Sequence, residues 1–211
     1  MKVFVVSYGG SGSWTLVNYL NTLNIDSYHI HSRTPPQLIC DSSSTSEHFD
    51  YTNLIPEGKV IFIYRKPIYS LLSSKSSSIT HFKNIAVNEE NITILKSLGF
   101  TLEANTSQTT FKNYLTQNKD IVNYENFFDN YYNCNFNKNY EILCVNFDHL
   151  WTHIEAICKF VGKEYDGNLP PREKKEYDDY LVSLSNKLFY NINNKIDKIT
   201  SPKIITPNHY T

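Results

Sequence analysis

The sequence predicts an α/β fold with three layers, α/β/α, around a central parallel sheet. Apolar runs of strand length recur along the chain, and helical patterns separate them. Strands that are followed by helices connect through right-handed crossovers, so we expect a parallel sheet of about four or five strands. The strands are expected near residues 2–8, 26–31, 59–65 and 141–147.

The first strand leads into a glycine-rich turn that contains Gly9, Gly10 and Gly12. Because glycine has no Cβ, backbone N–H groups in such a turn can approach an anion closely. A helix expected from about residue 13 would direct its positive N-terminal end at the same place. The alternative is a plain tight connection between strand and helix. The position after the first strand of an α/β pattern favours a phosphate site.

The turn lacks the lysine of the common nucleotide-binding sequence GxxxxGK[ST]. Ser13 and Trp14 follow Gly12 where that sequence has lysine and a hydroxyl residue. A metal-dependent ATPase or GTPase is therefore disfavoured, and a divergent kinase stays open.

The strand near residues 59–65 ends in Arg65, and Pro67 stands where a helix tolerates proline best, in its first turn. Ser73 follows eight residues after Arg65 and is expected two turns into that helix. Ligands of open α/β sheets bind outside the carboxyl ends of the strands, so Arg65 would face the same crevice as the glycine-rich turn. A guanidinium and a hydroxyl could hold a second phosphate there. The alternative is a solvated charge beside a serine-rich helix surface.

Together these two segments resemble the nucleotide site of sulfotransferases that use 3′-phosphoadenosine 5′-phosphosulfate (PAPS). That family has a loop such as YPKSGTTW for the 5′-phosphosulfate, and a strand ending in Arg, with Ser eight residues on, for the 3′-phosphate. Residues 8–13 (YGGSGS) stand in the first place, and Arg65 with Ser73 in the second. Residues 141–162, with an acidic turn at Asp148 and a helix ending in Phe-Val-Gly, are similar to a segment near the family's C-terminal end. The resemblance spans most of residues 2–172.

The resemblance implies a P-loop NTPase-like sulfotransferase fold and transfer of a sulfuryl group from PAPS to a hydroxyl. The acceptor would be a carbohydrate or another small molecule, and no metal is required. The residues that would bind the nucleotide are Gly9, Gly10, Ser11, Gly12, Ser13, Trp14, Arg65 and Ser73.

One departure concerns Gly10, because the family's loop has Lys or Arg before its Ser-Gly pair. Three consequences stay open. The first is that activity is lowered, and the second is that another cation, such as Lys66 or Lys75, replaces the missing one. The third is that the protein binds PAPS or its product without catalysis. A catalytically silent nucleotide-binding protein and a divergent P-loop kinase are therefore the alternative functions.

His29 and His31 are candidates for the base that removes the acceptor's proton. They are two residues apart on an expected strand, so they face the same side. A neutral imidazole near pH 7 suits this task. Many cytosolic sulfotransferases have a Lys-Thr-His-x-Pro segment in this part of the chain, and its histidine is the catalytic base. Residues 31–35 are similar in position. His31 is favoured because it lies closer to the crevice. A histidine bonded to backbone is the alternative, and no metal site is expected since no Cys or acidic partner stands at ligand spacing.

Length and composition predict one domain over residues 1–211, with an extended tail from about residue 200. The net charge of −1, with both signs interspersed, predicts neither a nucleic-acid nor a membrane-surface partner. No apolar segment approaches membrane-spanning length, and the first strand begins at Lys2. We therefore expect no signal peptide and a cytoplasmic location, with a small-molecule or glycan acceptor as the partner.

Overall fold

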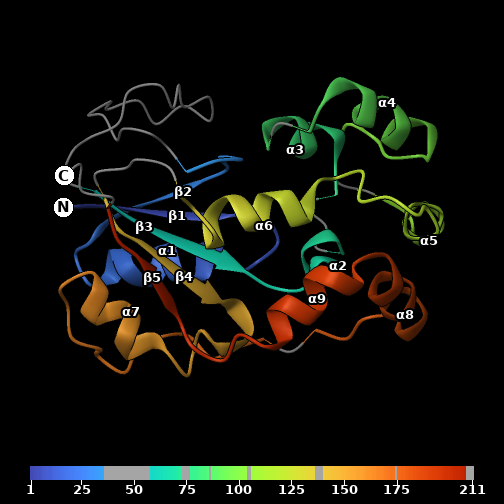
Figure 1. The fold of residues 1–211 in the computed structure, drawn as a ribbon. Coiled ribbons are helices and arrows are strands. Elements are labelled where there is room, and N and C mark those ends of the chain that lie inside the picture. The colour runs from blue at the N-terminus through green and yellow to red at the C-terminus, as the bar shows by residue number, and fades with distance from the viewer. Residues whose placement is uncertain are drawn as a thin grey trace.

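The protein's structure is a computed structural model that describes residues 1–35, 58–72, 77–85, 87–103, 106–135, 140–173 and 175–207. These residues contain a five-stranded sheet with the order β2-β1-β3-β4-β5 (Figure 1). The strands are β1 (Lys2–Ser7), β2 (Asp26–Ile30), β3 (Gly58–Tyr64), β4 (Ile142–Asn146) and β5 (Lys203–Ile205). The four strands expected from the sequence are confirmed, and β1 lies inside the sheet between β2 and β3.

The sheet is mostly parallel. β1 pairs in parallel with β2 and with β3, and β3 pairs in parallel with β4. β5 instead runs antiparallel to β4, with Leu143 opposite Ile204. The expectation of a parallel sheet therefore needs one correction, because part of the tail after residue 200 supplies an antiparallel edge strand.

Helices occupy much of the rest of the described chain. They are α1 (Ser13–Thr22), α2 (Pro67–Leu71), α3 (Ile79–Asn84), α4 (Glu89–Ser97), α5 (Gln108–Leu115), α6 (Tyr124–Tyr132), α7 (Ile154–Phe160), α8 (Asp179–Leu188) and α9 (Tyr190–Asp197). Several begin at a side chain that accepts a hydrogen bond from the first turn, namely Ser78, Asn88, Ser107 and Asp178. Within the ranges described, no helix combines the length and the apolar character needed to cross a bilayer.

The sheet carries a hydrophobic core on each face, because successive strand residues point to opposite sides. Val3 and Val5 of β1 pack on one face in a cluster with residues of α1 and α7. Phe4 and Val6 pack on the other face in a cluster with residues of α6, α8 and α9. Helices therefore cover both faces, as expected for an α/β protein whose strands read as continuous apolar runs.

The carboxyl ends of β1 to β4 lie at one edge of the sheet because these strands are parallel. Three connections leave this edge: residues 8–12 after β1, residues 65–66 after β3, and the 3₁₀ turn η1 (Phe147–His149) after β4. Their arrangement brings segments that are far apart in the chain around one crevice, as in other open α/β sheets.

Candidate functional site

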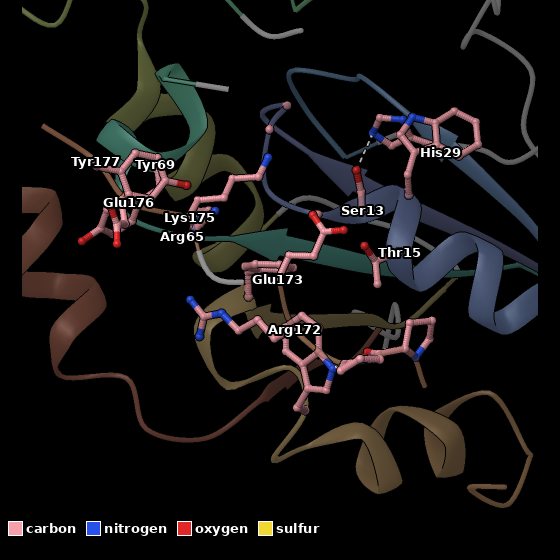
Figure 2. Close-up of a pocket in the computed structure, with 18 of the residues that line it drawn as sticks. Ser13, Thr15, His29, Arg65, Tyr69, Arg172, Glu173, Lys175, Glu176 and Tyr177 are labelled. Atoms are coloured by element: carbon pink, nitrogen blue, oxygen red, sulfur yellow. Dashed lines mark hydrogen bonds between the residues drawn. The ribbon is translucent and has the colours of Figure 1, made fainter. Parts of the chain in front are cut away.

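A pocket of about 840 Å³ lies at this edge of the sheet. The loop after β1, the end of β2, Arg65, η1 and residues 170–173 with 175–177 all contribute to its wall. Figure 2 shows Arg65, Tyr69 and Lys175 at one side of the pocket, and Ser13 with His29 at the other. Glu173 lies between these two groups, with its carboxylate directed toward Ser13.

The loop between β1 and α1 presents unpaired backbone donors to this pocket. The amides of Gly10, Ser11, Gly12 and Ser13 have no hydrogen-bond acceptor among the described residues. Gly12 caps α1 with a φ of 72°, and no side chain caps this helix. A Cβ on Gly12 would overlap the ring of Phe147, so only glycine fits this position. Free amides at a helix N-terminus are a suitable site for an anion.

The two serines of the loop have different surroundings. Ser11 is fully buried, and its hydroxyl lies 2.9 Å from the hydroxyl of Ser70 and 3.2 Å from the carbonyl oxygen of Gly9. The Ser11 side chain is therefore hydrogen-bonded inside the protein, and Ser11, unlike Gly10, Gly12 and Ser13, is not on the pocket wall. Ser13 lines the pocket, and its hydroxyl contacts His29.

Arg65 is held rigidly at the end of β3. The residue is only 7% exposed, and its guanidinium lies 4.8 Å from the ring centres of both Tyr69 and Phe147. Its carbonyl accepts a 2.7 Å hydrogen bond from the Tyr124 hydroxyl. Nη2 lies 3.4 Å from Asp148, and Nε is buried without a protein partner. Such an arginine has hydrogen-bonding capacity that the described residues do not use.

Arg172 is a pocket residue that no sequence motif marks as functional. It donates to the Asp148 carboxylate at 2.5 Å and to the Asp148 carbonyl at 3.2 Å. Asp148 therefore sits between two guanidinium groups, and its shorter contact is to Arg172. Two guanidinium groups share this one carboxylate, and the pocket wall also carries Lys175, Glu173 and Glu176, so charges of both signs line it.

Lys66 and Lys75 are the lysines that could replace the loop cation missing at Gly10. Lys66 forms an ion pair with Asp197 at 2.8 Å and is not part of the pocket wall. Lys75 and Ser73 lie outside the described residues, and α2 ends at Leu71. Lys175 does line the pocket, from the segment that also carries Glu173.

His29 and His31 both line the pocket, and the structure adds His81 to them. The ring centres of His29 and His31 are 4.3 Å apart, and those of His31 and His81 are 5.0 Å apart. Burial lowers the pKa of His29 to about 3 and that of His81 to about 3, and it also lowers the pKa of His31. All three imidazoles are therefore neutral at pH 7.

The hydrogen bonds of these neutral rings define which nitrogen carries the proton. His31 Nδ1 lies 3.2 Å from the Ser7 carbonyl, and His81 Nε2 lies 2.7 Å from the Tyr8 carbonyl. A carbonyl only accepts, so both of these nitrogens donate. His31 Nε2 and His81 Nδ1 are then unprotonated, and neither has a protein partner among the described residues.

His29 is engaged differently, through a chain of hydroxyl groups. The Gly9 amide donates to the Ser7 hydroxyl at 3.3 Å, and Ser7 donates to Ser13 at 3.1 Å. Ser13 Oγ lies 2.9 Å from His29 Nε2. The arrangement that satisfies the chain has Ser13 donating to Nε2, which occupies the lone pair of His29.

Within the described ranges, no group of three or more His, Cys, Asp or Glu side chains is arranged to hold a metal ion. Of the residues expected to bind a nucleotide, the structure places Gly9, Gly10, Gly12, Ser13, Trp14 and Arg65 on the wall of one pocket.

No family model, curated protein or solved structure matches the chain in the three comparisons with known proteins.

Proposed function

We propose that the protein is a sulfotransferase that moves a sulfuryl group from PAPS to a hydroxyl of a carbohydrate or other small molecule, on a P-loop type of sulfotransferase fold. One observation carries this proposal. The unpaired amides of the β1–α1 loop and the incompletely paired Arg65 line the same pocket from different strands. PAPS carries anionic groups on both its 5′ and 3′ sides, so it requires two separate anion sites of this kind.

In this proposal the loop amides and the N-terminal end of α1 bind the 5′-phosphosulfate. Arg65 binds the 3′-phosphate, and Arg172 contributes from the opposite side of Asp148. Ser73, outside the described residues, remains a predicted second ligand of the 3′-phosphate. Tyr69 and Phe147 keep the guanidinium of Arg65 in place, so little conformational entropy is lost when an anion binds.

His31 accepts the proton in the transfer step. The acceptor oxygen attacks sulfur, the bond between sulfur and the bridging phosphate oxygen breaks, and the acceptor's proton moves to His31 Nε2. The products are a sulfate ester, 3′-phosphoadenosine 5′-phosphate (PAP) and a proton that His31 later releases to water. His31 suits this role better than His29, because the lone pair of His29 Nε2 is occupied by Ser13.

Calorimetry with PAP and with AMP tests the proposed nucleotide. The two differ only in the 3′-phosphate, so PAP is expected to bind at least tenfold more tightly, a difference of about 1.4 kcal/mol or more. Equal affinities, or no binding of either, would contradict the proposal. Radiolabelled PAPS incubated with panels of glycans and small hydroxyl compounds then identifies the acceptor.

A catalytically silent nucleotide-binding protein is a second candidate, favoured by one specific observation. Gly10 leaves the loop without a cationic side chain, and Lys66 is paired with Asp197. Tight PAP binding with no turnover on any acceptor would select this candidate. A kinase would instead bind ATP with Mg²⁺ in the same calorimeter and leave PAP unbound.

A further inference from the structure

The pocket has a charged half and an uncharged half. Arg65, Lys175 and Glu176 lie on one side, and His29 lies on the other (Figure 2). His31 and His81 adjoin His29 through ring contacts, and all three imidazoles are neutral because burial lowers each pKa. The three histidines of the half that faces away from the arginines therefore carry no formal charge at pH 7, and Glu173 lies between this half and the charged one.

Trp14 adds an aromatic surface to the uncharged half. Its indole contacts the His29 ring edge-on at 5.3 Å, yet 59% of the residue is exposed. A tryptophan that lines a pocket and keeps most of its surface in solvent has a face on which a flat apolar surface can pack.

His31 and His81, which line the same pocket, supply hydrogen-bond acceptors. His31 Nε2 and His81 Nδ1 carry lone pairs without protein partners among the described residues, on rings whose centres are 5.0 Å apart. Each can accept one hydroxyl hydrogen. Two adjacent acceptors suit a molecule with two neighbouring hydroxyl groups.

We propose that this half of the pocket, formed by Trp14, His31 and His81, binds a pyranose ring of an uncharged carbohydrate. A pyranose has an apolar C–H face that packs on the indole, and neighbouring hydroxyls that donate to the two histidines. A phenol offers only one hydroxyl, and an open-chain polyol has no flat face. The proposal rests on the proposed function, since it names the acceptor class of the same site, and it moves Trp14 from the nucleotide to the acceptor.

The two tryptophans of the chain provide the experiment. Both Trp14 and Trp151 line the pocket, and Trp151 lies in the charged half, 5.9 Å from the Arg172 guanidinium. Protein labelled with 5-fluorotryptophan therefore gives two fluorine resonances, which a Trp14→Phe variant assigns. The probes are methyl β-glucoside, methyl β-galactoside, mannitol and phenol, each titrated into the full chain with and without PAP.

The expected result is a saturable shift of the Trp14 resonance with at least one of the two glycosides, and a shift at least tenfold weaker with mannitol and phenol. His31→Gln and His81→Gln should each weaken that glycoside's affinity about tenfold. His153→Gln is the matched control, because His153 also bonds a backbone carbonyl, at 3.0 Å to Thr200, but does not line the pocket. If a histidine variant fails to fold, calorimetry of Trp14→Ala, a substitution at an exposed position, measures the loss of glycoside affinity instead.

No saturable Trp14 shift with either glycoside, or a stronger response to phenol, would overturn the carbohydrate assignment. PAP reports on the proposed function separately, through the Trp151 resonance. A PAP response without a glycoside response rejects only the carbohydrate subsite. A glycoside response at Trp14 without any PAP binding rejects the nucleotide and keeps the subsite.

Discussion

Ser13 and His29 are joined by a 2.9 Å hydrogen bond that links the first turn of α1 to β2. The bond fixes the loop that carries the unpaired amides against the strand that carries the candidate base. Ser7 extends the link at 3.1 Å from the end of β1. The β1–α1 loop and the histidine cluster are therefore one connected unit, and the proposed anion site is tested by substitutions in either part.

Arg65→Ala should weaken PAP binding by roughly 30- to 1000-fold, because a buried, charge-assisted contact worth about 2–4 kcal/mol is lost. Affinity for AMP, which lacks the 3′-phosphate, should barely change. Calorimetry with both nucleotides measures the difference. The PAP affinity of Arg65→Lys should lie between those of the wild type and Arg65→Ala, because lysine keeps the positive charge but lacks the paired donors of a guanidinium. Equal weakening of both nucleotides would make Arg65 a structural residue.

His31→Ala should lower turnover by about 10²- to 10⁴-fold and leave PAP affinity unchanged. Burial lowers the pKa of His31, so the base stays unprotonated above its ordinary pKa near 6.5. The wild-type kcat/KM should therefore be flat from pH 7 upward and decline only below pH 6.5. A His153→Ala variant serves as the control. Wild-type activity that rises from pH 7 to 8 would contradict a base of lowered pKa.

Glu173→Gln should tighten PAP binding about two- to fivefold, because it removes a carboxylate directed toward Ser13, beside which the 5′-phosphosulfate is proposed to bind. The gain should shrink as salt concentration rises. Glu164→Gln, at an exposed site away from the pocket, provides the control. Unchanged affinity at low salt would show that the anion binds beyond the reach of Glu173.

Gly12→Ala should be more destabilising than Gly167→Ala. Both glycines have positive φ, of 72° and 82°, so alanine strains each backbone by about 1–2 kcal/mol. Only at Gly12 would the Cβ overlap the Phe147 ring, which adds about 1–3 kcal/mol, whereas nothing lies within 4 Å at Gly167. Denaturant unfolding of the two variants measures the difference in their free energies of unfolding. Equal losses of stability would contradict a steric clash at Gly12.

Asp120→Asn should increase stability above pH 6. Burial raises the pKa of Asp120 to about 6, although the Glu125 amide donates to its carboxylate at 3.0 Å. Because the folded pKa exceeds the unfolded value of 3.8, the folded protein loses stability as pH rises from about 4 to 6, by on the order of 2–3 kcal/mol. Asparagine keeps an acceptor for Glu125 and has no charge to bury. Urea unfolding at pH 4.5 and pH 7.5 tests this, and an equal effect of the substitution at both pH values would contradict it.

The sequence predicts those parts of the site whose signal is local. The β1–α1 loop and Arg65 each follow a continuous apolar run. The hydrophobic pattern of such a run is enough to predict where the strand ends. The structure confirms these strands, and it brings both features to one pocket. Ser11 shows the limit of such reasoning, because the burial of its hydroxyl against Ser70 depends on α2.

Two pocket residues could not have been predicted, because tertiary packing alone brings them to the pocket. His81 reaches the Tyr8 carbonyl across 73 residues of chain, from a helix with no motif of its own. Arg172 reaches Asp148 from a segment without helix or strand. β5 was also missed, since its three residues gain strand structure only from pairing with the edge of β4.

The antiparallel pairing of β5 with β4 has a consequence for synthesis of the chain. β4 is complete at Asn146, yet the strand that pairs with its outer edge among the described residues, Lys203–Ile205, comes nearly sixty residues later. While the ribosome adds that stretch, the nascent sheet presents an unpaired row of backbone groups. Ribosome-bound chains that stop between β4 and β5 are thus the species most exposed to strand-to-strand association, and the emergence of the last strand ends that exposure.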